Sequence, residues 1–141
     1  EEIQSILDSL LSNKENQTKY NTLKDMSSEE VSNVQPNIIL AKALELIEQN
    51  FQDPEFSVED LAQLSGMSRS QFHRKLSESV GLSANQLIKL SRLTKAKELL
   101  KDEKLNISEI AYETGFSDPS YFGKVFRKEF GLSPKAFRHS Q

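Results

Sequence analysis

Two stretches of the chain carry small polar and basic residues at the spacing of one helix face. In the first stretch these residues are Ser70, His73, Arg74 and Ser77. In the second stretch the same spacing gives Ser120, Gly123, Lys124 and Arg127. Hydroxyl, imidazole and long cationic side chains at such spacing can hydrogen bond to base edges and phosphate oxygens. The same pattern also occurs on the solvated face of an ordinary amphipathic helix.

The opposite face of each stretch is apolar. It carries Phe72, Leu76 and Val80 in the first stretch and Phe122, Phe126 and Phe130 in the second. Apolar residues that recur every four positions predict a helix with one buried face. If that face is buried, the polar positions must face solvent or a ligand.

The two stretches belong to a longer repeat. Leu61-Ala62 and Gly66-Met67-Ser68 recur 49 positions later as Ile110-Ala111 and Gly115-Phe116-Ser117. Gly81-Leu82-Ser83 recurs 50 positions later as Gly131-Leu132-Ser133. The second copy therefore has one extra residue, near Asp118-Pro119, where a turn can accept it without disturbing either core face.

Each copy predicts two helices joined by a sharp turn. Capping pairs are expected at Ser57 with Asp60, Ser68 with Gln71 and Asn106 with Glu109. Gly66 and Gly115 can supply the left-handed backbone of the turns. We therefore predict an all-α fold of about seven helices, in which a long helix at 84–101 joins helix-turn-helix subdomains at about 57–83 and 106–133.

The N-terminal part differs from the repeat in charge and pattern. Residues 1–56 carry a net charge of −7, whereas residues 57–141 carry +4, the sign needed to approach a polyanion. An apolar stripe at residues 2–12 predicts a short helical arm, a polar linker follows at 13–35, and the main domain is expected at 36–141. The chain begins at Glu1, so we expect it to be a fragment of a longer protein.

Composition argues against several other classes of protein. The chain has no cysteine and only two histidines, so we expect no disulfide, no metal site and no cofactor. No catalytic constellation or glycine-rich phosphate loop is visible, and we expect no enzyme activity. No signal peptide or membrane-spanning run is apparent, which indicates a cytoplasmic protein without membrane contact.

The second copy carries a specific family motif. The run Ile110-Ala111, Gly115-Phe116-Ser117-Asp118-Pro119-Ser120-Tyr121-Phe122, Phe126, Gly131, Ser133-Pro134 and Arg138 closely resembles the DNA-binding domain of AraC/XylS-type bacterial transcription regulators. The first copy is similar, and the resemblance covers about residues 38–139. It implies a sequence-specific regulator, usually an activator, that inserts helices 68–80 and 118–130 into successive major-groove segments.

The resemblance also implies which residues contact DNA. Base contacts fall on Ser70, His73, Arg74, Pro119, Ser120 and Lys124. Phosphate contacts fall on Arg69, Gln71, Arg92, Arg127, Lys128 and Lys135. Gly123 occupies a base-reading position but has no side chain. We therefore expect the first helix-turn-helix to supply most of the sequence discrimination and the second mostly affinity.

The partners that the resemblance implies are double-stranded DNA, RNA polymerase and an absent upstream regulatory domain, either a receiver or a ligand-sensing domain. Residues 1–20 resemble the last helix and tail of a receiver from a two-component system, but an amphipathic arm that forms a homodimer is an equal alternative. A helical protein-interaction module that does not bind DNA remains the alternative function. A steep fall of duplex affinity with rising salt would distinguish the two.

Overall fold

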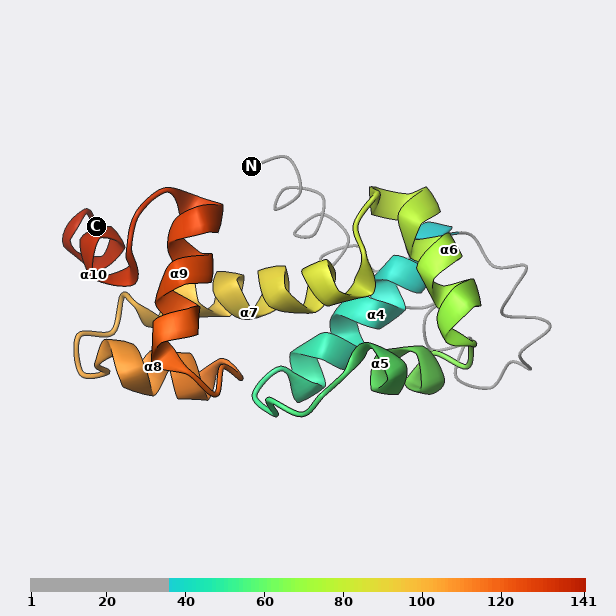
Figure 1. Cartoon of the computed structure of the whole chain (residues 1–141), viewed down its shortest axis with the longest axis horizontal. Coiled ribbons are helices and arrows are strands. Elements are labelled where there is room, and N and C mark those ends of the chain that lie inside the picture. Colours follow the sequence, from blue (N-terminus) through green and yellow to red (C-terminus); the bar gives the residue numbers. More distant parts are fainter. Residues whose placement is uncertain (1–35) are drawn as a thin grey trace. The chain divides into compact units, whose positions relative to one another are not determined.

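The computed structural model describes residues 36–141. They form seven helices (Figure 1): α4 (Pro36–Asn50), α5 (Val58–Leu64), α6 (Arg69–Val80), α7 (Ala84–Leu99), α8 (Ile107–Glu113), α9 (Pro119–Phe130) and α10 (Pro134–His139). No strand occurs within 36–141, and none of the helices in this range is long and apolar enough to cross a membrane. The predicted all-α class is confirmed. The arm and linker predicted at residues 2–35 lie outside the described residues.

The chain divides into two compact units. The described part of the first unit comprises residues 36–49 and 56–88, and the second comprises residues 50–55 and 89–141. Helices α5 and α6 pack together in the first unit, and α8 and α9 pack together in the second. Each unit therefore contains one helix-turn-helix pair, as the repeat predicts.

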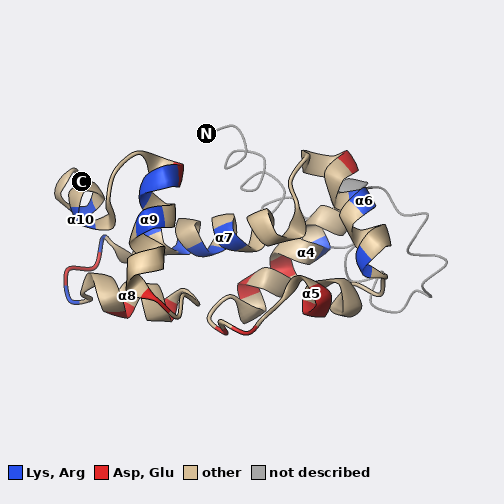
Figure 2. Ribbon diagram, viewed as in Figure 1, with Lys and Arg blue, Asp and Glu red and all other residues tan. Residues whose placement is uncertain are grey.

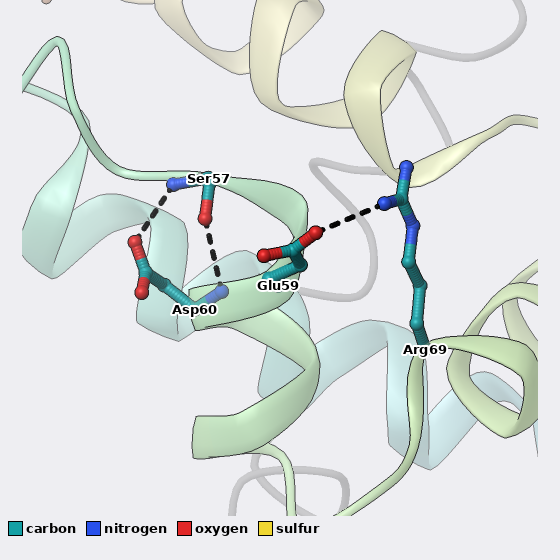
Figure 3. A network of polar contacts seen from close by, with 4 residues as sticks. All are labelled: Ser57, Glu59, Asp60 and Arg69. Atoms are coloured by element: carbon teal, nitrogen blue, oxygen red, sulfur yellow. Dashed lines mark hydrogen bonds and ion pairs between the residues drawn. The ribbon is translucent and has the colours of Figure 1, made fainter.

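In the first unit, the apolar face of α6 is buried at Phe72 and Leu76 and partly buried at Val80. Phe72 and Leu76 have no exposed surface, and Leu61 of α5 is equally buried. Helix α5 begins with the predicted capping box, in which Ser57 Oγ accepts from the Asp60 amide at 3.1 Å and the Asp60 carboxylate accepts from the Ser57 amide at 3.0 Å (Figure 3). These contacts fix the start of α5 and, through it, the packing partner of α6.

In the second unit, phenylalanine rings form the core beneath α9. Phe122 lies between Phe116 and Phe126, with ring centroids 5.1 and 5.7 Å apart. Phe126 in turn contacts the rings of Phe130 and Phe137 at 4.7 and 5.7 Å. Tilted and edge-to-face ring pairs add stability beyond that from the area that they bury. These pairs therefore favour a single orientation of α9, with its phenylalanine face toward the core.

The turns use glycine where the sequence predicts it. Gly66 and Gly115 have φ of +76° and +88°, in the left-handed region that favours glycine. Helix α7 ends at Leu99, two residues before the predicted end. There the amides of Lys101 and Asp102 donate to the carbonyls three residues earlier, at 3.2 and 3.0 Å, which tightens the chain into a turn.

Candidate nucleic-acid interface

The predicted base-reading residues of the first unit lie together on the outer face of α6. Ser70, His73 and Arg74 are exposed, while Phe72 on the opposite face is fully buried. Ser77 continues the exposed row by one more turn. Helix α6 thus presents a hydroxyl, an imidazole and a guanidinium along one side, and these groups can donate to the acceptors on base edges.

The two phosphate candidates at the start of α6 have partners within the protein. Gln71 belongs to a capping box: its side-chain oxygen accepts from the Ser68 amide at 3.1 Å, and Ser68 Oγ accepts from the Gln71 amide at 3.2 Å. Arg69 donates from Nη1 to the Glu59 carboxylate of α5 at 3.2 Å (Figure 3). Both side chains of this ion pair are largely exposed, at 66% for Arg69 and 75% for Glu59.

In the second unit, α9 presents a more basic face with fewer groups that can read bases. Ser120, Lys124, Arg127 and Lys128 are exposed, whereas Pro119 and Gly123 are half-buried. A Cβ built on Gly123 would meet no atom within 4 Å, so open space remains where a reading side chain could stand. Lys124 is therefore the long donor that α9 offers toward bases.

The remaining phosphate candidates occupy different places. Lys135, on α10, is exposed and lies in the same unit as Arg127 and Lys128. Arg92, on α7, does not join this exposed group. It donates from Nε to the Phe51 carbonyl at 3.1 Å and from Nη2 to the Asp53 carbonyl at 2.9 Å.

Arg92 is thus half-buried, with its guanidinium bonded to the 50–55 loop, and the phosphate contact predicted for it stays a prediction. Burial lowers the pKa of its guanidinium, and the Asp53 carboxylate partly opposes that shift. The loop that Arg92 holds also passes against Gly115. A Cβ on Gly115 would overlap the Phe51 carbonyl oxygen. We assign Arg92 to fixing the 50–55 loop against the turn of the second helix-turn-helix.

Charge is segregated between the helices of each unit. The charged residues of α6 and α9 are mainly basic, with one acidic residue near the C-terminal end of each helix, Glu78 and Glu129, whereas the charged residues of α5 and α8 are acidic (Figure 2). This distribution of charge gives the second helix of each pair the surface suited to a polyanion.

Within residues 36–141, no group of three or more histidine, cysteine, aspartate or glutamate side chains could hold a metal ion.

Comparisons with known proteins agree with this geometry. A family model described as a helix-turn-helix domain matches residues 61–140. "Histidine kinase P4" of Formosa agariphila is 35% identical and is matched over 72% of this chain and 7% of its own length. The transcriptional activator RhaS of Escherichia coli is 29% identical over 94% of this chain and 53% of its own length. The chain thus spans a small part of the kinase and about half of RhaS.

Solved structures share the fold. An AraC-type transcriptional regulator from Chromobacterium violaceum superposes with a TM-score of 0.67 at 30% identity, over 72% of this chain and 89% of its own. The DNA-binding domain of AdpA, solved with a target DNA, superposes with a TM-score of 0.64 at 30% identity, over 75% and 91%. Fold and site therefore define a helix-turn-helix protein. More specifically, the chain belongs to the AraC-type helix-turn-helix family.

Proposed function

We propose that this chain binds duplex DNA through α6 and α9 and acts as a sequence-specific transcription regulator. One observation carries the proposal: the second helix of each helix-turn-helix buries an apolar face and exposes a row of donors. These donors are Ser70, His73 and Arg74 in one unit and Ser120 and Lys124 in the other. The DNA in the AdpA structure and the name of RhaS support the same reading.

The two units contribute unequally in this proposal. α6 offers three different donor side chains to bases, whereas α9 offers one long cation and leaves space at Gly123. Arg127, Lys128 and Lys135 add positive charge, which attracts phosphates of any sequence. The first unit accordingly supplies discrimination and the second supplies affinity.

Selection of binding sites from a pool of randomised duplexes tests the function. We expect a two-part motif with one strongly specified half and one loosely specified half. Affinity for the selected duplex should fall steeply with rising salt and exceed that for random duplex. Equal, salt-insensitive binding to all duplexes, or none, would favour the protein-interaction module instead.

The partners of the whole protein follow from the relatives. We propose that a regulatory segment outside this chain controls DNA binding, because the matched relatives are longer and include a histidine kinase. We propose activation, through contact with RNA polymerase, as the outcome, since RhaS is named an activator. In this proposal the chain is a binding module without enzyme activity of its own.

A further inference from the structure

Tyr121, the third residue of α9, is a large aromatic side chain that stays exposed. It has 49% of its surface accessible, although its neighbours Phe116 and Phe122 are buried. Its ring centroid lies 6.3 Å from that of Phe116, at an interplanar angle of 51°. The ring is thus supported on one side by the core of the second unit. The structure gives its hydroxyl no hydrogen-bond partner among residues 36–141.

The start of α9 explains why this hydroxyl is free. At the equivalent position of α6, Gln71 closes a capping box with Ser68. In α9 the N-cap is Asp118, whose carboxylate accepts from the Ser120 amide at 2.9 Å. The extra residue in the second copy thus changes how the helix is capped. Tyr121 takes no part in the cap, and its side chain is available for another contact.

The same cap removes backbone donors that a phosphate could use. Pro119, the first residue of α9, has no N–H, and the Ser120 N–H is already bound by the Asp118 carboxylate. The first unit has Arg69 at the position of Pro119, so it has a cation there that the second unit lacks. A phosphate near the start of α9 can therefore meet at most one of the first backbone donors, the Tyr121 N–H, so that a side-chain donor adds to its binding.

Tyr121 lies on the side of α9 that carries its lysines. Lys124 and Lys128 follow it by three and seven residues, the spacing of one helix face, and all three are exposed. Two positive charges beside a phenol favour an anion as the group that reaches this face. Tyrosine hydroxyls are among the groups that contact DNA phosphates.

We propose that the Tyr121 hydroxyl donates a hydrogen bond to a phosphate oxygen of bound duplex DNA, at the N-terminal end of the exposed row that Lys124 and Lys128 continue along α9. This inference rests on the proposed function and adds a contact that is independent of base sequence. Packing of the ring against Phe116 restricts the side chain before binding, so that little conformational entropy is lost when the contact forms.

The substitution Tyr121→Phe tests the proposal because it removes only the hydroxyl. Tyr112→Phe is the matched control, since Tyr112 is a similarly exposed tyrosine, at 56%, on α8. We expect Tyr121→Phe to weaken binding about fivefold to tenfold, as loss of one solvent-exposed hydrogen bond would. The loss should be equal on the selected duplex and on random duplex of the same length, and Tyr112→Phe should leave both affinities unchanged.

Salt dependence separates this contact from that of a lysine. Tyr121→Phe removes no charge, so the slope of log affinity against log salt should stay as in the wild type. Lys128→Ala should make this slope shallower by about one, the change expected for the loss of one phosphate contact. The melting temperature should not change, because the hydroxyl is exposed. Loss on the selected duplex alone would mean a base contact and overturn the proposal.

Unchanged affinity of Tyr121→Phe on both duplexes would also overturn it, while leaving the proposed function intact. If the wild-type protein bound no duplex at all, the proposed function would fail and this inference with it.

Discussion

Arg92 and Phe51 lie 41 residues apart in sequence and are joined by a hydrogen bond of 3.1 Å from Nε to the carbonyl oxygen. Arg138 makes the equivalent contact to the Leu100 carbonyl at 2.9 Å, and its Nη2 reaches the Asp102 carbonyl at 3.1 Å. Phe51 and Leu100 are 49 positions apart, as the repeat requires. Each loop before a helix-turn-helix is therefore held by a guanidinium from the helix that follows that pair.

Arg92→Lys should destabilise the protein. A lysine ammonium lacks the planar fork that reaches two carbonyls together, so we expect the free energy of unfolding to fall by about 1–3 kcal/mol. Arg74→Lys is the control, because Arg74 is exposed on α6. Denaturant unfolding measures both variants. An unchanged stability of Arg92→Lys, together with a flatter salt dependence of DNA binding by Arg92→Ala, would support the phosphate role.

Gly115→Ala should cost more than Gly131→Ala. Both glycines have positive φ, +88° and +80°. An alanine at either position is strained in this left-handed conformation, which should lower the free energy of unfolding by about 1–2 kcal/mol. At Gly115 the new Cβ would also overlap the Phe51 carbonyl and lie 2.7 Å from Arg92 Nε, whereas at Gly131 it meets nothing within 4 Å. Thermal unfolding of the two variants compares them directly. Equal losses would show that the loop can move away without cost.

Ser65→Ala should leave stability unchanged or raise it. Ser65 is fully buried and its Oγ has no hydrogen-bond partner, so alanine removes a desolvated hydroxyl. The corresponding Thr114 donates from Oγ1 to the Ile110 carbonyl at 2.8 Å, and we expect Thr114→Val to lose about 1 kcal/mol. Chemical denaturation of both variants checks the contrast. A clear loss in Ser65→Ala would mean that the hydroxyl is bonded in solution.

Local signals made most of the fold predictable. The four-residue spacing of Phe72 and Leu76, or of Phe122 and Phe126, depends only on helix geometry and a buried face. Caps and glycine turns act within a few residues of one another, so the capping boxes at Ser57 and Ser68 could also be predicted from short motifs.

The site was only partly predictable, because some side chains are placed by contacts distant in sequence. Exposure of His73 and Arg74 follows from helix phase, but no local signal indicates that Arg92 turns toward Phe51, 41 residues away. The internal hydrogen bond of Gln71, unlike those of Arg92, could be predicted, because its spacing from Ser68 indicates a capping box. The phosphate contact that we propose for Tyr121 was not predicted from the sequence, although helix phase places Tyr121 on the same face as Lys124 and Lys128.

Glu59→Gln should strengthen DNA binding about twofold to fivefold, because the Glu59 carboxylate no longer competes with a DNA phosphate for the Arg69 guanidinium. The gain is small because the ion pair between Glu59 and Arg69 is exposed, and exposed ion pairs are weak. The gain should disappear in an Arg69→Ala background. Glu113→Gln, an identical charge change on α8, is the control. Titration of labelled duplex at several salt concentrations measures each variant, and weaker binding by Glu59→Gln would show that Glu59 orients Arg69 instead.

Arg74→Ala and Lys128→Ala should weaken DNA binding in different ways. Arg74 lies on the exposed face of α6 with Ser70 and His73, and loss of a bidentate base contact should cost about 1–3 kcal/mol on the selected duplex and relax its base preference. Lys128 lies in the last turn of α9, and its loss should weaken all duplexes alike and flatten the salt dependence. Affinities for selected and random duplex, measured at several salt concentrations, separate the two effects. Equal losses of Arg74→Ala on both duplexes would show that Arg74 contacts phosphate, and discrimination would then have to come from Ser70, His73 or the second unit.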